Sequence, residues 1–181
     1  MTEPSLPDKV VALARALDDV PHAFGGALAL AYFAEPRATQ DIDLNVFVAE
    51  SQATDVLSVL APLGVEIEGA EQVARSDGQV RVHWGRTPID LFFAYDRFHE
   101  AARSSARVLP FADSQISVLA PEHLFVCKVV FDRPKDWVDL DAMLAQGTSV
   151  DAAEVLRWVG RLVGDEDRRY DRVAALLTSG R

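Results

Sequence analysis

Two aspartates, Asp41 and Asp43, stand one residue apart in an otherwise apolar run. If this run is a strand, residues i and i+2 face the same side, so both carboxylates would project together while Ile42 and Leu44 face the core. Neighbouring carboxylates repel each other unless positive charge lies between them. A divalent cation with oxygen ligands is the usual solution. The pair therefore predicts a site for one or two Mg²⁺ ions, with Mn²⁺ as the alternative metal.

A glycine pair and a short turn precede the two aspartates. Gly25 and Gly26 open an apolar, helix-like run and would let backbone N–H groups come close to a phosphate chain. Arg37 and Thr39 lie in the turn before Asp41 and are candidate nucleotide-binding residues. Asp-x-Asp alone often marks only a strand end, and Gly-Gly alone often marks only a loop. Together, at this spacing, they predict a site for a metal and a nucleotide.

The segment of residues 24–48 resembles the first motif of the nucleotidyltransferase superfamily, whose fold is shared with DNA polymerase beta. The resemblance implies a third carboxylate on a neighbouring strand, and Asp90, in the apolar run of residues 89–93, is the candidate. It implies that Asp41, Asp43 and Asp90 bind the metal and are catalytic. Asp90 is also the predicted general base for an acceptor hydroxyl. A role as a plain strand-edge residue is the alternative for Asp90.

A second block, residues 128–140, extends the match. Its pattern Lys-x4-Arg-x-Lys-Asp-x2-Asp-Leu resembles a downstream motif of the AbiEii-like and MenT-type toxin nucleotidyltransferases of type IV toxin–antitoxin systems. The resemblance implies that Lys128 is catalytic and also binds the nucleotide, together with Arg133, Asp136 and Asp139. It also implies a cognate antitoxin as a candidate partner.

The charged side chains of the second block have simpler explanations as well. Residues 124–131 are apolar except for Lys128, and an ammonium group is costly to bury without a partner. Lys128 therefore either faces a cleft with phosphates or carboxylates, or snorkels to the surface. Asp136 and Asp139 are three residues apart, so ion pairs on a solvated helix face would also explain them. Arg133 stands at a helix break and would reach a triphosphate or cap the preceding helix.

The net charge of −10 is unexpected for a protein that holds nucleic acid through many phosphates, and it suits a small cationic acceptor better. One helix face near the C-terminus could still be basic enough to bind phosphates. Its arginines are Arg157, Arg161, Arg168, Arg169 and Arg172. The alternative is that neighbouring acidic residues pair with these arginines. The single cysteine excludes an intramolecular disulfide. No signal-peptide pattern and no apolar stretch of membrane-spanning length is evident, so we expect a cytoplasmic protein that does not contact membranes.

The pattern of apolar residues and turn formers predicts an α/β (α+β) fold, in which a mixed β-sheet is flanked by helices and followed by a C-terminal helical lobe. We expect a nucleotidyltransferase core at residues 1–119 and the lobe at residues 120–181, with the substrate cleft between them, although one compact domain is the alternative. The predicted strands are residues 41–48, 64–67, 79–84, 88–94, 106–109 and 115–118, and the predicted helices are residues 7–19, 25–33, 51–60, 98–104, 121–132, 135–145, 151–163 and 166–177.

These observations predict a metal-dependent nucleotidyltransferase that moves a nucleoside monophosphate from an NTP to a hydroxyl acceptor and releases pyrophosphate. The resemblance to toxins implies tRNA or a protein as the acceptor. An aminoglycoside-type enzyme with a small cationic acceptor is one alternative, which the acidic charge favours. A catalytically silent nucleotide-binding or antitoxin-like module is another, although all three aspartates are present.

Overall fold

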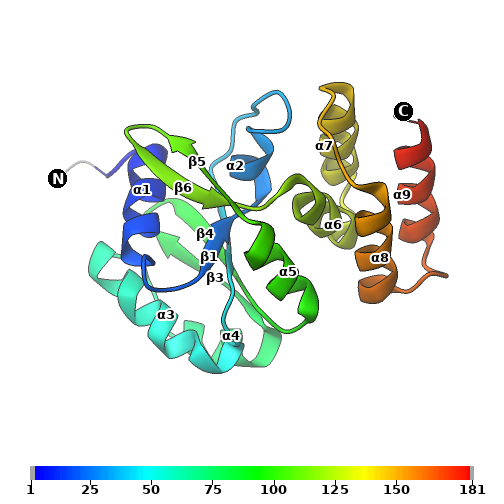
Figure 1. Ribbon diagram of the computed structural model, residues 1–181. Coiled ribbons are helices and arrows are strands. Elements are labelled where there is room, and N and C mark those ends of the chain that lie inside the picture. The colour runs from blue at the N-terminus through cyan, green and yellow to red at the C-terminus, as the bar shows by residue number, and fades with distance from the viewer. Residues whose placement is uncertain (1–2, 180–181) are drawn as a thin grey trace. The chain divides into compact units, whose positions relative to one another are not determined.

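A computed structural model describes residues 3–179 and has the predicted mixed α/β architecture (Figure 1). The chain forms two compact units. The first contains Met1–Leu28 and Ala38–Leu119, and the second contains Ala29–Arg37 and Ala120–Arg181. The short segment Ala29–Arg37 therefore belongs with the C-terminal helices. The division into a core of residues 1–119 and a lobe of residues 120–181 stays a prediction.

The strands of the first unit form one six-stranded mixed sheet with the order β3-β4-β2-β1-β6-β5 within the described residues. Strands β2 and β4 are parallel, as are β1 and β6, and the remaining neighbours are antiparallel. The strands are β1 (His22–Phe24), β2 (Ile42–Val46), β3 (Gln79–Trp84), β4 (Thr87–Phe93), β5 (Arg107–Phe111) and β6 (Ser114–Val118).

Alternation of apolar and polar residues gives the sheet two different faces. In β3, Val80, Val82 and Trp84 are buried, while the residues between them are exposed. Helix α1 (Leu6–Ala16) contacts β6, helix α4 (Ala70–Asp77) contacts β3, and helix α3 (Ala53–Leu60) contacts both of these helices, so the three lie together on the apolar side of the sheet (Figure 1). Helix α5 (Arg97–Ser105) follows β4. The opposite face of β2, β3 and β4 therefore carries their charged side chains.

Helix α1 is fixed to the β3–β4 turn by a buried lysine. The side chain of Lys9 is 1% exposed, and its ammonium group donates to Trp84 O at 2.7 Å and to Thr87 Oγ1 at 2.9 Å. The Glu3 carboxylate balances the charge at 2.5 Å. A buried ammonium is tolerated here because all of these partners are acceptors.

The second unit is a helical bundle around α6 (Pro121–Phe131). Residues on nearly every side of α6 are buried, which is the pattern of a central helix. It contacts α7 (Pro134–Ala145), α8 (Ala152–Val163) and α9 (Arg168–Ser179). Among residues 3–179, no helix is both long and apolar enough to span a bilayer.

Several local predictions differ from the structure, and strand β1 (His22–Phe24) was not predicted at all. Helix α2 covers only Gly26–Leu30, rather than residues 25–33. The predicted strand at residues 64–67 is reduced to an isolated bridge between Glu66 and His83. A 3₁₀ turn, Glu50–Gln52, precedes α3, which begins at Ala53 rather than residue 51. Helix α4 was not predicted, because its only buried residues are the small Ala70 and Ala74, which leave no apolar periodicity.

A buried histidine between α6 and α8 predicts that acid destabilises the second unit. The His123 side chain is 1% exposed, and its Nε2 lies 3.8 Å from Glu154 Oε1. Burial lowers the pKa of His123 below its ordinary value of 6.5, although Glu154 opposes the shift. The unfolded chain then binds the proton more readily than the folded chain, so stability should fall as pH drops through about 6.5 and below.

Thermal unfolding of the wild type and of His123→Gln between pH 8 and pH 5 tests this expectation. The variant should lose part of the decrease in melting temperature that the wild type shows on acidification. His83→Gln, at an exposed position of β3, is the matched control and should keep the full decrease. Equal acid sensitivity in all three proteins would contradict the assignment to His123.

Candidate active site

The register of the sheet brings two of the three predicted carboxylates side by side. In the parallel pair of β2 and β4, Asp43 is the direct partner of Asp90. In the antiparallel pair of β3 and β4, Arg81 is the direct partner of Asp90. Direct partners on adjacent strands project to the same face of a sheet. Arg81, Asp90 and Asp43 therefore form a row across three strands.

Asp41 lies immediately before β2, two residues from Asp43. The hydroxyl oxygen of Thr39 accepts the backbone N–H of Asp41 at 3.3 Å and lies 3.2 Å from the carbonyl oxygen of the same residue. Thr39, predicted to bind nucleotide, thus shapes the backbone at Asp41 in this structure. Asp41 is half-buried, as is Asp43.

The two glycines lie against Asp43. The N–H of Gly25 donates to the carbonyl oxygen of Asp43 at 2.9 Å, so this N–H supports β2 and does not point to a ligand. Gly26 has a φ of 51°, in the left-handed region that favours glycine. A Cβ atom at Gly26 would lie 2.5 Å from Asp43 Cγ and still closer to Oδ2. Only glycine at this position leaves space for the Asp43 carboxylate.

Arg81 was not predicted as a site residue, yet it is the closest cation to Asp90. Its Nε and Nη2 each donate to one oxygen of Asp90 at 2.7 Å, a bidentate ion pair. The hydrogen bonds that Arg81 donates to Asp90, together with the negative charge of Asp90, raise the pKa of the Arg81 guanidinium, and the charges of Asp41 and Asp43 add to the shift. The available signal was the position of Arg81 on the exposed face of a strand beside the strand of Asp90.

The chemistry of this donor set fits a hard divalent cation, because Asp43 and Asp90 are direct partners on adjacent strands and Asp41 stands two residues before Asp43, which offers three carboxylate ligands. Within the part of the chain that the structure describes, however, no three acidic, histidine or cysteine side chains are gathered closely enough to form a metal site. Arg81 holds both oxygens of Asp90 instead. Metal binding by the three aspartates stays a prediction.

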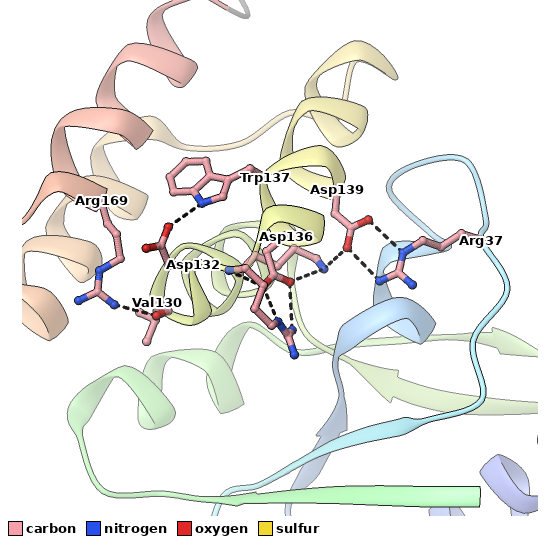
Figure 2. A network of polar contacts seen from close by, with 9 residues as sticks. Arg37, Val130, Asp132, Asp136, Trp137, Asp139 and Arg169 are labelled. Atoms are coloured by element: carbon pink, nitrogen blue, oxygen red, sulfur yellow. Dashed lines mark hydrogen bonds and ion pairs between the residues drawn. The ribbon is translucent and has the colours of Figure 1, made fainter.

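The charged residues of the second block form an ion-pair network inside the second unit (Figure 2). Lys128 is about 3% exposed, and its Nζ lies 2.6 Å from Asp139 Oδ2 and 3.7 Å from Asp136 Oδ1. The Arg37 guanidinium holds Asp139 with two hydrogen bonds of 3.0 Å. The alternative of a lysine that snorkels to the surface is therefore wrong. The solvated-face alternative is wrong too, since Asp136 is 0% and Asp139 4% exposed.

The pKa of Asp139 shows which influence dominates in this network. Burial raises it, but hydrogen bonds from Arg37 and Lys128 and the charges of both residues outweigh burial, so the net pKa lies below its ordinary value. Asp139 is therefore held as a carboxylate, and Lys128 has a negative partner in the core.

Arg133 caps the helix that follows it, not the one that precedes it. It is the N-cap residue of α7, and its backbone N–H and guanidinium both donate to the buried Asp136 carboxylate, at 3.2 Å and 2.7 Å. The guanidinium also lies over the Phe131 ring. The structure thus brings together five of the predicted site residues, but their charged groups pair with one another: Arg37, Lys128, Arg133, Asp136 and Asp139.

The predicted basic face near the C-terminus is largely neutralised by acidic and aromatic neighbours. Arg169 pairs with Asp167 at 2.8 Å and donates to the carbonyl oxygen of Val130, while Arg168 pairs with Asp132. The same Asp132 accepts the indole N–H of Trp137 at 2.8 Å (Figure 2). Arg157 pairs with Glu154, and Arg172 lies over the Trp137 ring at 3.8 Å. These contacts favour pairing over a free cationic surface.

Asp41 just before β2, Asp43 on β2 and its register partner Asp90 on β4 form the arrangement of carboxylates that the resemblance to nucleotidyltransferases predicts. The family model described as "Nucleotidyl transferase AbiEii toxin, Type IV TA system" matches residues 10–178. The chain belongs to this family of nucleotidyltransferase toxins, and it is an enzyme of nucleotidyl transfer. This membership disfavours the alternative of a catalytically silent module.

Solved structures with a TM-score above 0.5 share the fold at low sequence identity. The solution structure of the antibiotic-resistance factor ANT(2'')-Ia is 15% identical with a TM-score of 0.56, and the match covers 98% of this chain and 94% of that one. The crystal structure of ANT(2'')-Ia in complex with adenylyl-2''-tobramycin is 15% identical with a TM-score of 0.54, covering 96% and 97%. An antigenic nucleotidyltransferase-like protein from Paracoccidioides brasiliensis is 17% identical with a TM-score of 0.47, covering 97% and 88%. A search of the curated proteins found no match.

Proposed function

We propose that the protein transfers a nucleoside monophosphate from an NTP to a hydroxyl group of tRNA or of a protein. The acceptor oxygen would form a bond to the α-phosphorus, the bond from that phosphorus to the bridging oxygen would break, and pyrophosphate would leave. The observation that carries this proposal is the register of β2 and β4, in which Asp43 is the direct partner of Asp90, with Asp41 two residues before Asp43. Membership of a toxin family supports tRNA or protein as the acceptor.

The carboxylates of Asp41, Asp43 and Asp90 would hold one or two Mg²⁺ or Mn²⁺ ions. Bound there, such ions supply positive charge to the triphosphate and to the departing pyrophosphate. Gly26 keeps the space that the Asp43 carboxylate needs, and its N–H, rather than that of Gly25, would approach a phosphate. Asp90 would take the proton of the acceptor hydroxyl on a carboxylate oxygen, which requires Arg81 to release that oxygen.

Arg37, Lys128 and Arg133 would neutralise the negative charge of the triphosphate. This role is proposed because Lys128 and Arg133 match the family motif and Arg37 pairs with Asp139 of the same motif. Arg37 and Arg133 have side chains that are 39% and 48% exposed, and are more accessible to phosphates than the buried Lys128. Lys128 would have to exchange Asp139 for a phosphate oxygen, or act by holding Asp139 for Arg37. Asp136 and Asp139 would then contribute by orienting the two arginines.

A small cationic acceptor such as an aminoglycoside is the second candidate, and the net charge of −10 is the observation that favours it. A cognate antitoxin is the partner that membership of a type IV toxin–antitoxin family suggests, and we propose that the protein acts in the cytoplasm.

Transfer assays with four α-³²P-labelled NTPs, each with tRNA, total cell protein or tobramycin as the acceptor, test the proposal. We expect label on tRNA or protein, lost in Asp41→Asn and Asp43→Asn and retained in Asp55→Asn, an exposed carboxylate of α3. Label on tobramycin alone would select the second candidate. Undiminished transfer by Asp43→Asn would remove the site from β2.

A further inference from the structure

Arg81 forms hydrogen bonds with both carboxylate oxygens of Asp90. In the proposed function, Asp90 is a ligand of the metal. The two hydrogen bonds of Arg81 have equal lengths of 2.7 Å, the fork geometry that guanidinium and carboxylate groups share. The Asp90 side chain is 20% exposed, so part of this ion pair is shielded from water. The pair is therefore stronger than a typical surface salt bridge.

The charges on this face of the sheet explain why a cation stands there. Asp41, Asp43 and Asp90 place three negative groups on the start of β2 and the middle of β4. Arg81 is the partner of Asp90 across β3 and β4, and Asp41 and Asp43 are close enough to act on its guanidinium. Without a positive group beside them, the three carboxylates would repel one another.

A metal ion and Arg81 need the same oxygen atoms. An oxygen that accepts a short hydrogen bond from a guanidinium cannot at the same time direct that lone pair to a divalent cation. Arg81 is also able to leave, because its side chain is 55% exposed and β3 is an edge strand of the sheet. Solvent on that side would accept the released guanidinium.

We propose that Arg81 is an exchangeable counter-ion of the carboxylate site: it neutralises Asp90 when no metal is bound, and it competes with a divalent cation for Asp90. The proposal rests on the proposed function for the place of the metal. It assigns to this chain a device that lowers metal affinity, keeps the apo site stable, and withholds Asp90 from proton transfer until Arg81 has moved.

Titration of the metal-free protein with Mn²⁺, followed by the electron paramagnetic resonance signal of the free ion, tests the competition. Arg81→Gln removes the competing charge and should bind Mn²⁺ about three- to tenfold more tightly, the range expected for the loss of a bidentate, partly shielded pair. Without metal the same variant should melt at a lower temperature than the wild type, and Mn²⁺ should raise its melting temperature more. Arg81→Lys keeps the charge without the fork and should fall between the two proteins.

Arg75→Gln is the matched control, because Arg75 pairs with Glu71 on α4 at 3.0 Å with a side chain that is 49% exposed. It should leave the Mn²⁺ affinity unchanged. Unchanged or weaker affinity in Arg81→Gln and Arg81→Lys, with a wild type that binds, would overturn the role of Arg81 and leave the metal site standing. Binding by Arg81→Gln alone would support the proposal in its strongest form. No binding by any of the proteins would overturn both the metal site and the competition.

Discussion

Replacing Gly26 by alanine should reduce nucleotidyl transfer about a hundredfold or more. The added Cβ would lie 2.5 Å from Asp43 Cγ and closer to Oδ2, so the carboxylate of Asp43 cannot keep its position. The Asp43 carboxylate must therefore rotate away from Asp90. A displacement of about 1 Å of a catalytic group typically costs about a hundredfold in rate. The measurement is the initial rate of label transfer from the NTP at saturating acceptor.

Gly69→Ala is the control for the backbone strain of this substitution. Gly69 has a φ of 70°, similarly left-handed, but nothing lies within 4 Å of a Cβ built on it. Both variants should lose about 1–2 kcal/mol of stability, because a Cβ is unfavourable in the left-handed region. Only Gly26→Ala should lose activity beyond what the loss of folded protein explains. Equal activities of the two folded variants would show that Gly26 does not position Asp43.

Gly25→Ala should give a smaller effect than Gly26→Ala. Its Cβ would lie 2.9 Å from the side-chain nitrogen of Asn45 and 3.4 Å from a methyl group of Leu119. These first contacts are with Asn45 and Leu119 rather than with the Asp43 carboxylate, and the φ of Gly25 is not in the left-handed region. The two glycines of the motif are therefore expected to differ: Gly26 leaves space for the Asp43 carboxylate, whereas Gly25 lies against Asn45 and Leu119.

The pairing of Asp43 with Asp90 is the part of the site that could be predicted from the sequence. An alternating strand orients Asp41 and Asp43 by itself, and a family resemblance supplied the neighbouring strand of Asp90. Arg81 could not be found in this way, because its role depends on which strand pairs with β4 and in which register. An arginine on the exposed face of an amphipathic strand is ordinary, and only the structure shows what lies opposite.

The ion-pair partners of the buried charged residues in the second unit could not be predicted from local sequence patterns either. Lys128 in an apolar helix signalled that a carboxylate or phosphate had to be near. The carboxylate belongs to Asp139, eleven residues away beyond the break between α6 and α7, and the second cation, Arg37, comes from a distant segment. Hydrophobic periodicity does not encode such contacts, since it describes one element at a time.

Replacing Asp139 by asparagine should lower the free energy of unfolding by about 3–5 kcal/mol, the usual cost of breaking a buried ion pair from one side. The ion pair of the buried Lys128 with Asp139 would be lost, with Asp136 at 3.7 Å still beside it, and Arg37 would lose its ion pair with Asp139. For a chain of this length, that loss corresponds to a decrease in melting temperature of roughly 6–20 °C. Asp141→Asn, at an exposed position of the same helix, is the matched control and should change stability little.

The pH dependence and a double variant distinguish this ion-pair role from a general packing defect. Because the pKa of Asp139 is lowered in the folded state, its contribution is complete above the ordinary value of 3.8 and is lost as pH falls through the folded-state pKa. The stability difference between the wild type and Asp139→Asn should therefore shrink in strong acid. Adding Lys128→Met to Asp139→Asn should recover part of the lost stability, because no unpaired ammonium then remains buried. If the double variant is less stable than Asp139→Asn by the full cost of Lys128→Met alone, the two side chains are not coupled, and the ion-pair role of Asp139 is wrong.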